Sequence, residues 1–278
     1  MNKIILEILF LFAIAQALGF FSGLVLISDI PFNPAFHELS VPASGNDLFD
    51  GVYMFGFMLI GAVIMLIFIR HIRNDFLFML LETALIATTS SIVFYSLLRL
   101  FFPYLESMMI AGSLGLILAG LKQLDDRFKN VSAILASAGV GALFGSSIGL
   151  MPLVILIALL AVYDYIAVFK TKHMVEFADY MMKRNVSFTI TSKKYIPELK
   201  RERRMDLGTG DIIVPVMLEV ALIPVSPVAS LFVFLGALVA LGIFLYLFFN
   251  KKVVLPAIPP IAFGMGVFFL IGKLAGMY

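Results

Sequence analysis

Two acidic residues lie within apolar stretches that are long enough to enter a membrane. Asp164 stands in LLAVYDYIAVFK, six residues before Lys170, and Asp211 closes GTGD and opens the next apolar run. A carboxylate at the centre of a helix in lipid costs about 2.5 kcal/mol or more, so it marks a functional site by default. At about 1.5 Å per residue, Asp164 lies roughly 9 Å inside the charged boundary. One loop joins the two runs, so both aspartates reach similar depth from the same side, which predicts a shared reaction.

The residues around Asp211 loosen the start of its helix. Gly208 and Gly210 permit backbone conformations and close approaches that side chains would block. Pro215 lies four residues after Asp211 and cannot donate a hydrogen bond to its carbonyl. On the other run, Tyr163 is expected either to offer a hydroxyl to the site or to anchor at the membrane interface.

A third segment reaches the same depth. Pro256, Pro259 and Pro260 in VVLPAIPPI cannot donate backbone hydrogen bonds. Irregular backbone inside a membrane is tolerated only where protein covers it or where it lines a water-filled cavity. We therefore expect Pro256-Ala257-Ile258 to border a cavity beside both aspartates.

Two carboxylates beside water can perform the chemistry of an aspartic protease. Like charges a few ångströms apart cannot both ionise easily, so the pair shares one proton. The ionised carboxylate takes a proton from water while the protonated one polarises the scissile carbonyl. The titration belongs to the pair, and either aspartate can take either part.

The composition is that of a polytopic membrane protein. The 278 residues are 62% hydrophobic and 14% charged, whereas soluble domains carry about 25% charged residues. A bilayer core of about 30 Å needs around 20 apolar residues per helix. Nine spans are predicted, at 4–27, 51–70, 76–102, 104–121, 131–149, 151–169, 211–223, 228–249 and 254–276.

These spans predict one all-α membrane domain over residues 1–278. Spans one to six occupy residues 1–169, a cytoplasmic loop follows at 170–210, and spans seven to nine occupy residues 211–278. The fifth span, VSAILASAGVGALFGSSIGL, is dense in glycine, alanine and serine. Such residues let helices approach closely in lipid, so this span is expected to pack tightly.

The basic residues predict the orientation. With the N-terminus in the cytoplasm, 18 of the 20 lysines and arginines face inside, and the exceptions are Arg99 and Lys273. The first external loop, 28–50, contains no lysine or arginine, as the positive-inside rule expects. We expect a multi-pass protein of the cell membrane whose catalytic loop is cytoplasmic. The net charge of +2 then reports topology, and no nucleic-acid partner is expected.

The remaining side chains give no reason to expect a cofactor. The chain has no cysteine, which excludes disulfides, thiol catalysis and thiolate ligation of a metal. His37, His71 and His173 fall in separate loops, so no metal site is expected.

One stretch of the long loop has the pattern of a strand. Residues 186–191 alternate apolar and polar side chains, several of them β-branched. A single strand needs a partner, either elsewhere in this loop or in an extended segment of another chain. In the second case Ile190 is a candidate contact for substrate.

These motifs resemble those of one family. Tyr163-Asp164 in the sixth span, Gly208-Thr209-Gly210-Asp211 at the seventh and Pro256-Ala257-Ile258 at the ninth resemble the presenilin and signal peptide peptidase family of GxGD intramembrane aspartyl proteases. The length resembles that of the microbial, archaeal-type members. The resemblance implies a presenilin-like fold in which the two aspartates are catalytic, the glycines and threonine shape the helix start, and the Pro-Ala-Ile segment positions substrate. The family's usual Pro-Ala-Leu is Pro-Ala-Ile here, which changes branching but conserves volume.

The resemblance also implies the partners. The substrates would be transmembrane helices of other membrane proteins, cut within the lipid bilayer. Signal peptide peptidases work alone, so obligatory partner subunits are not expected, and a homo-oligomer is compatible with the sequence. The loop lacks the long hydrophobic insert at which presenilins cut themselves, so self-cleavage is not expected.

Three other interpretations remain open from the residues alone. A transporter or channel could use the two aspartates with Glu82 and Glu219 as cation or proton sites, although no internal repeat supports it. A prepilin-type GxGD peptidase also uses membrane aspartates. Finally, both aspartates could simply pair with basic residues at the cytoplasmic rim.

Overall fold

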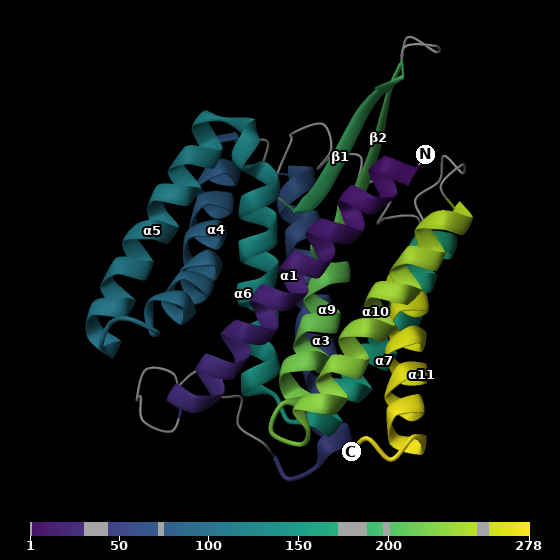
Figure 1. Cartoon of the computed structure of the whole chain (residues 1–278). Helices are drawn as coiled ribbons and strands as arrows, with labels where there is room; N and C mark the ends of the chain where they lie inside the picture. Colours follow the sequence, from purple (N-terminus) through teal and green to yellow (C-terminus); the bar gives the residue numbers. More distant parts are fainter. Residues whose placement is uncertain (1, 31–43, 72–74, 172–187, 197–200, 249–255) are drawn as a thin grey trace.

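The computed structural model describes residues 2–30, 44–71, 75–171, 188–196, 201–248 and 256–278. Within these residues, a bundle of nine helices carries a two-stranded hairpin at one end (Figure 1). The helices are α1 (Asn2–Asp29), α3 (Asp47–His71), α4 (Asp75–Leu98), α5 (Tyr104–Leu124), α6 (Lys129–Ser147), α7 (Leu150–Ile166), α9 (Gly210–Leu222), α10 (Pro227–Phe248) and α11 (Ile258–Leu274). The strands are β1 (Thr189–Ile196) and β2 (Arg201–Gly208).

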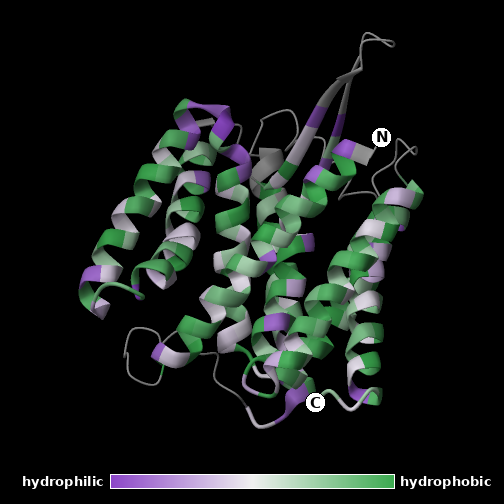
Figure 2. Cartoon of the chain, in the orientation of Figure 1, coloured by the Kyte–Doolittle hydropathy of each residue, from purple (hydrophilic) through white to green (hydrophobic). Residues whose placement is uncertain are grey.

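Each predicted span overlaps one of these helices. Seven helices, all except α9 and α11, are long and apolar enough to cross a membrane, so the chain is a multi-pass membrane protein. Helix α11 has 17 residues and α9 has 13, and the number of nine crossings stays a prediction. Figure 2 shows hydrophobic residues along the helices and hydrophilic ones at the α5–α6 turn and on the hairpin. The N-terminus lies at that same end, as the predicted topology requires (Figure 1).

Helix α9 is the centre of the bundle. It packs against α1, α6, α7, α10 and α11, and nine of its 13 residues are buried, which is unusual for a helix with an acidic first turn. Helix α3, by contrast, packs on α7 and exposes most of its apolar surface. In a membrane protein that surface faces lipid, so the polar chemistry has to lie around α9.

Glycines bring the central helices together. A Cβ added to Gly19 of α1 would lie 2.3 Å from Val216 Cγ1, and one added to Gly23 would lie 2.4 Å from Val220 Cγ2. From α6, a Cβ on Gly141 would lie 2.5 Å from Val216. Real Cβ atoms do not approach so closely, so only glycine allows α9 to lie this near both α1 and α6. The tight packing predicted for the fifth span is therefore present.

The strand predicted in the loop belongs to an internal hairpin. Strands β1 and β2 pair antiparallel from Thr189 with Gly208 to Ile196 with Arg201. The internal partner, one of the two alternatives, is thus confirmed, although residues 186 and 187 lie outside the described part of the chain. Ile190 pairs with Leu207, and its side chain is completely buried in the hydrophobic core.

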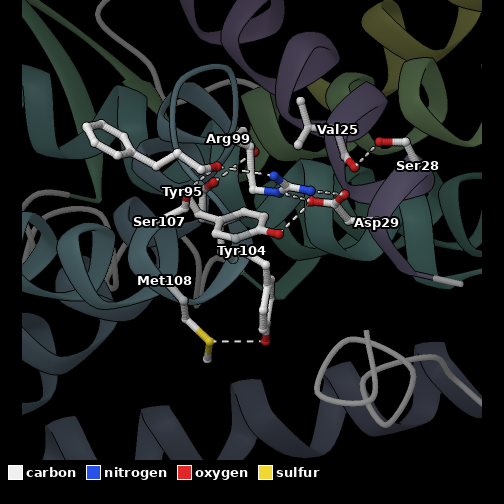
Figure 3. A network of polar contacts seen from close by, with 11 residues as sticks. Val25, Ser28, Asp29, Tyr95, Arg99, Tyr104, Ser107 and Met108 are labelled. Carbon is white, nitrogen blue, oxygen red and sulfur yellow. Dashed lines mark hydrogen bonds and ion pairs between the residues drawn. The ribbon is translucent and has the colours of Figure 1, made fainter. Parts of the chain in front are cut away.

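Arg99, one of the two exceptions to the charge pattern, is paired (Figure 3). Its Nε and Nη2 atoms lie 2.8 and 3.0 Å from the Asp29 carboxylate, which also accepts a 2.5 Å hydrogen bond from the Tyr95 hydroxyl. This bidentate pair joins the end of α1 to the end of α4. Bidentate, charge-assisted pairs are among the stronger hydrogen bonds in proteins, so Asp29 gives Arg99 a well-held counter-charge.

Candidate active site

Asp164 lies near the end of α7, shortly before the α-helix gives way to a π-helical turn. A π-helical turn at Ala167–Thr171 follows directly, and such turns are frequent at functional sites. The Asp164 side chain is only 8% exposed. The backbone N–H of Ile258 donates to its Oδ2 at 3.3 Å. This carboxyl is therefore buried but held by a neighbouring helix.

Asp211 lies in the first turn of α9, opposite Asp164. Its carboxyl lies against the Gly208 backbone, since a Cβ added to Gly208 would lie 3.2 Å from Asp211 Oδ2, and Asp164 is near enough for the two charges to interact. The helix N-terminus also favours negative charge at this position. Helices α7, α9 and α11 pack pairwise around these groups. The structure thus brings together the two aspartates that the sequence indicates.

The GTGD segment joins the hairpin to α9 without an intervening loop. Strand β2 ends at Gly208, and the N–H and hydroxyl of Thr209 both donate to the Phe188 carbonyl, at 3.0 and 3.2 Å. The Thr209 carbonyl then accepts from Ile213 N–H at 2.9 Å, as the first bond of the helix. Pro215 lies inside α9. One residue, Thr209, therefore closes the hairpin and starts the helix that carries Asp211.

The Pro-Ala-Ile segment lies beside Asp164. Pro256 and Ala257 are buried and non-helical, and α11 begins at Ile258. Because Pro259 and Pro260 occupy the first turn, where N–H groups have no helical partner, they start the helix without loss of hydrogen bonds. The N–H of Ile258 remains and is the group that meets Asp164.

Two other candidate residues have different surroundings. The ring of Tyr163 packs edge-on against Phe55 of α3, with centroids 6.1 Å apart, so it joins α7 to the lipid-exposed helix. Ile190, the candidate substrate contact, is buried beneath the hairpin. Its backbone is engaged with β2, so it supports the hairpin.

Among the described residues, neither aspartate takes part in an ion pair. The ion pairs of the described residues are Asp29–Arg99, Glu82–Lys122, Asp125–Arg127 and Asp206–Arg204, and none includes Asp164 or Asp211. Glu82 is thus paired between α4 and α5. Glu219 is fully buried, and neither of its carboxyl oxygens has a hydrogen-bond partner among the described residues. In the described part of the chain, no cluster of three or more histidine, aspartate or glutamate side chains could hold a metal ion.

The two glycines of the motif differ in the space around them. A Cβ on Gly208 would lie 3.2 Å from Asp211 Oδ2, whereas one on Gly210 would meet no atom within 4 Å. We expect Gly208→Ala to lower kcat by about tenfold, because small displacements of a catalytic group are costly. Gly210→Ala, the matched control, should stay within about threefold in an assay of peptide hydrolysis. Equal losses in both variants would contradict this assignment.

Two carboxyls come together in this membrane bundle, one near the end of α7 and one at the start of α9. This is the architecture of an intramembrane aspartyl protease. Comparison with known families agrees, because the family model described as signal-peptide peptidase, presenilin aspartyl protease matches residues 22–277. The chain belongs to this family and is an intramembrane aspartic endopeptidase.

Solved structures agree on the fold. Two chains, each described as a presenilin family intramembrane aspartate protease, are similar over nearly their whole length. The first, in space group C222, has 23% identity, covers 98% of this chain and 99% of its own, and gives a TM-score of 0.70. The second, in space group P2, has 24% identity, covers 95% and 96%, and gives a TM-score of 0.65. A search of curated proteins found no significant match.

One polar cluster near the site has no signal in the sequence. Lys129 and Asn130 begin α6 and contact Thr191 of β1, about 60 positions away. A lysine and an asparagine at the end of an apolar span are typical of an ordinary membrane boundary, so their position predicts no further role. A periodicity or a local motif cannot reveal a contact between residues so far apart in the chain.

Proposed function

We propose that Asp164 and Asp211 are the catalytic pair of this protease. The observation that carries the proposal is that α7, α9 and α11 converge, so that the Asp164 carboxyl lies 3.3 Å from the Ile258 N–H and the Asp211 carboxyl lies against the Gly208 backbone. Two carboxyls fixed in this way can share one proton. Backbone donors hold them in place without a cation that would keep both ionised.

The chemistry uses one water and no cofactor. The ionised carboxylate removes a proton from water as its oxygen attacks the scissile carbonyl carbon, and the protonated carboxyl donates to the carbonyl oxygen. The tetrahedral intermediate then collapses: the C–N bond breaks, and the amine leaves with the proton that the first carboxylate took from water. The other carboxylate recovers its proton from a hydroxyl of the intermediate, which restores the pair. Either aspartate can begin as the acid.

Substrate must be extended before it is cut, and the hairpin offers an edge for it. Both backbone groups of Thr191 bond to the side chain of Asn130, so they point away from β2. In an antiparallel pair, the opposing residue Asp206 then directs its backbone groups outward on the other side. Alternation along β2 gives Arg204 and Gly208 the same direction.

The outer edge of β2 therefore leads to Asp211. Gly208 is the last residue of that edge, and its backbone already reaches the Asp211 carboxyl. A substrate strand added along Arg204, Asp206 and Gly208 would arrive beside the catalytic pair. This replaces Ile190 as the proposed site of pairing and leaves Ile190 the role of anchoring β1 in the core.

The direction of the substrate follows from the proposed topology. If the N-terminus and the hairpin are cytoplasmic, as the basic residues indicate, the chain cuts single-span helices whose N-termini are outside, near their cytoplasmic ends. We expect such helices to be cut at least about tenfold faster than the same helices inserted in reverse, measured by mass spectrometry in proteoliposomes. A reversed strand would have to pair with β2 in the other direction, which changes the hydrogen-bond pattern and the bond presented to the aspartates. Reporter tags in the 28–50 loop provide the control on orientation. A cytoplasmic tag or a preference for reversed helices would overturn this topology.

The remaining assignments are part of the same proposal. The protease acts in the cell membrane without an obligatory partner subunit, alone or as a homo-oligomer, and needs no cofactor. Tyr163 and Thr209 shape the site around the aspartates, while Gly210 begins α9 in open space. Pro256 and Ala257 hold the non-helical backbone that presents the Ile258 N–H.

A further inference from the structure

The side chain of Asn130 binds the hairpin as a peptide group would. Its Nδ2 donates to the Thr191 carbonyl at 2.8 Å, and its Oδ1 accepts from the Thr191 N–H at 2.9 Å. A carboxamide has the same donor and acceptor as a peptide unit. Asn130 therefore occupies the outer edge of β1 at Thr191 in the way that a neighbouring strand would, and it fixes the position of β1 relative to α6.

Further contacts hold the same point. Lys129 Nζ lies 3.1 Å from the Thr191 hydroxyl, which also bonds to the Asp206 carboxylate across the hairpin. Ser192 donates to Glu7 of α1 at 2.7 Å. Thr191 and Ser192 are buried. The hairpin is thus attached to α6 and α1, the two helices whose glycines also hold α9.

These contacts connect the edge proposed for substrate to the catalytic helix. Strand β2 is held by β1, β1 is held by Asn130 on α6, and α6 lies against α9, which carries Asp211. A slip of one residue in a strand turns every side chain to the opposite face. The position of the hairpin relative to α6 therefore decides which peptide bond of a paired substrate lies beside the aspartates.

We propose that Asn130 is a positioning residue that sets the register of the substrate strand on β2, and hence the bond that is cut. This inference rests on the proposed pairing of substrate with β2. It assigns a specificity role to a residue that touches neither the aspartates nor the scissile bond.

The experiment compares Asn130→Leu with wild type on one transmembrane-helix peptide in detergent, with kinetics and product masses recorded. Leucine is similar in size but makes neither hydrogen bond. Two ordinary hydrogen bonds are worth roughly tenfold, so we expect KM to rise about tenfold while kcat stays within about threefold. Mass spectrometry should show cleavage at additional neighbouring bonds.

The matched control is Gln123→Leu. Gln123 also uses a side-chain amide in two hydrogen bonds, to Glu82 at 3.3 Å and Thr83 at 3.1 Å, but it joins α5 to α4 away from the hairpin. It should keep the wild-type KM and the wild-type products. If Gln123→Leu broadens the products as much as Asn130→Leu does, the effect is one of general stability and the inference fails.

Other outcomes also decide the question. An unchanged product pattern and KM in Asn130→Leu overturns the positioning role, as does a loss confined to kcat. Should the leucine variant fail to fold, Asn130→Asp keeps the acceptor for the Thr191 N–H and loses the donor, and it should give an intermediate KM; a wild-type KM contradicts the inference. If wild type itself does not cut, or if Asp211→Asn still cuts, the proposed catalytic pair fails instead.

Discussion

Asp164→Asn and Asp211→Asn should each abolish hydrolysis of a transmembrane-helix peptide while the protein stays folded. An amide can neither take a proton from water nor give one to the scissile carbonyl, and general acid–base catalysis contributes about 10²–10⁴-fold. Asparagine keeps the shape of the side chain and can still accept from the Ile258 or Gly208 N–H. The loss should therefore appear in kcat, measured by mass spectrometry of the products, with little change in melting temperature.

The matched control for both variants is Asp126→Asn. Asp126 lies in the exposed turn before α6, so the same chemical change there should leave turnover unaltered. Near-normal turnover in either dyad variant would refute the catalytic assignment. Glu219, a buried carboxyl of α9, would then become the next candidate for a catalytic carboxyl.

Gly19→Ala is expected to have the second-largest effect. The new methyl would lie 2.3 Å from Val216 Cγ1, so α1 and α9 must separate. Overpacking of this kind costs about 1–3 kcal/mol, and a shift of α9 also moves Asp211. We expect a lower melting temperature and a loss of at least about tenfold in kcat.

Adding Val216→Ala to Gly19→Ala tests whether the contact between the new methyl and Val216 causes the loss. It removes the two methyl groups nearest to the added Cβ and leaves Val216 Cβ at 3.3 Å, a contact that a small adjustment can relieve. The double variant should be more active and more stable than Gly19→Ala alone. Gly112→Ala, at a position where an added Cβ meets no atom within 4 Å, should be neutral. Simple addition of the two single losses in the double variant would show that the contact is not the cause.

The sequence indicates most directly those features that carry a large local penalty. A carboxylate in lipid is costly wherever it lies, so Asp164 and Asp211 stand out without any knowledge of the fold. The glycine-rich span predicts close packing for a similar reason. The sequence does not predict that Gly141 and Gly145 pack against α9. A small residue indicates that another helix comes close, but it does not indicate which helix.

The pairing of the hairpin strands could not be predicted from the sequence. Alternation predicts a strand near Ile190 but leaves its partner open, since the same pattern suits an internal hairpin and a bound peptide. The second strand, Arg201–Gly208, is rich in charge and lacks the alternation. Its pairing is determined by tertiary contacts: Asn130 and Glu7 hold β1, and Phe188 holds Thr209. Such contacts between distant positions have no local pattern to predict them.

The shortness of α9 has a consequence for where a polar chain can enter the bundle. Its 13 residues rise about 20 Å, roughly 10 Å less than the hydrocarbon thickness of an average bilayer. Because α1, α6, α7, α10 and α11 pack around α9, its length does not have to match the lipid. Non-helical backbone at membrane depth is tolerated where protein covers it. The strand that ends at Gly208 can therefore run directly into the helix that carries Asp211, sheltered by longer neighbours.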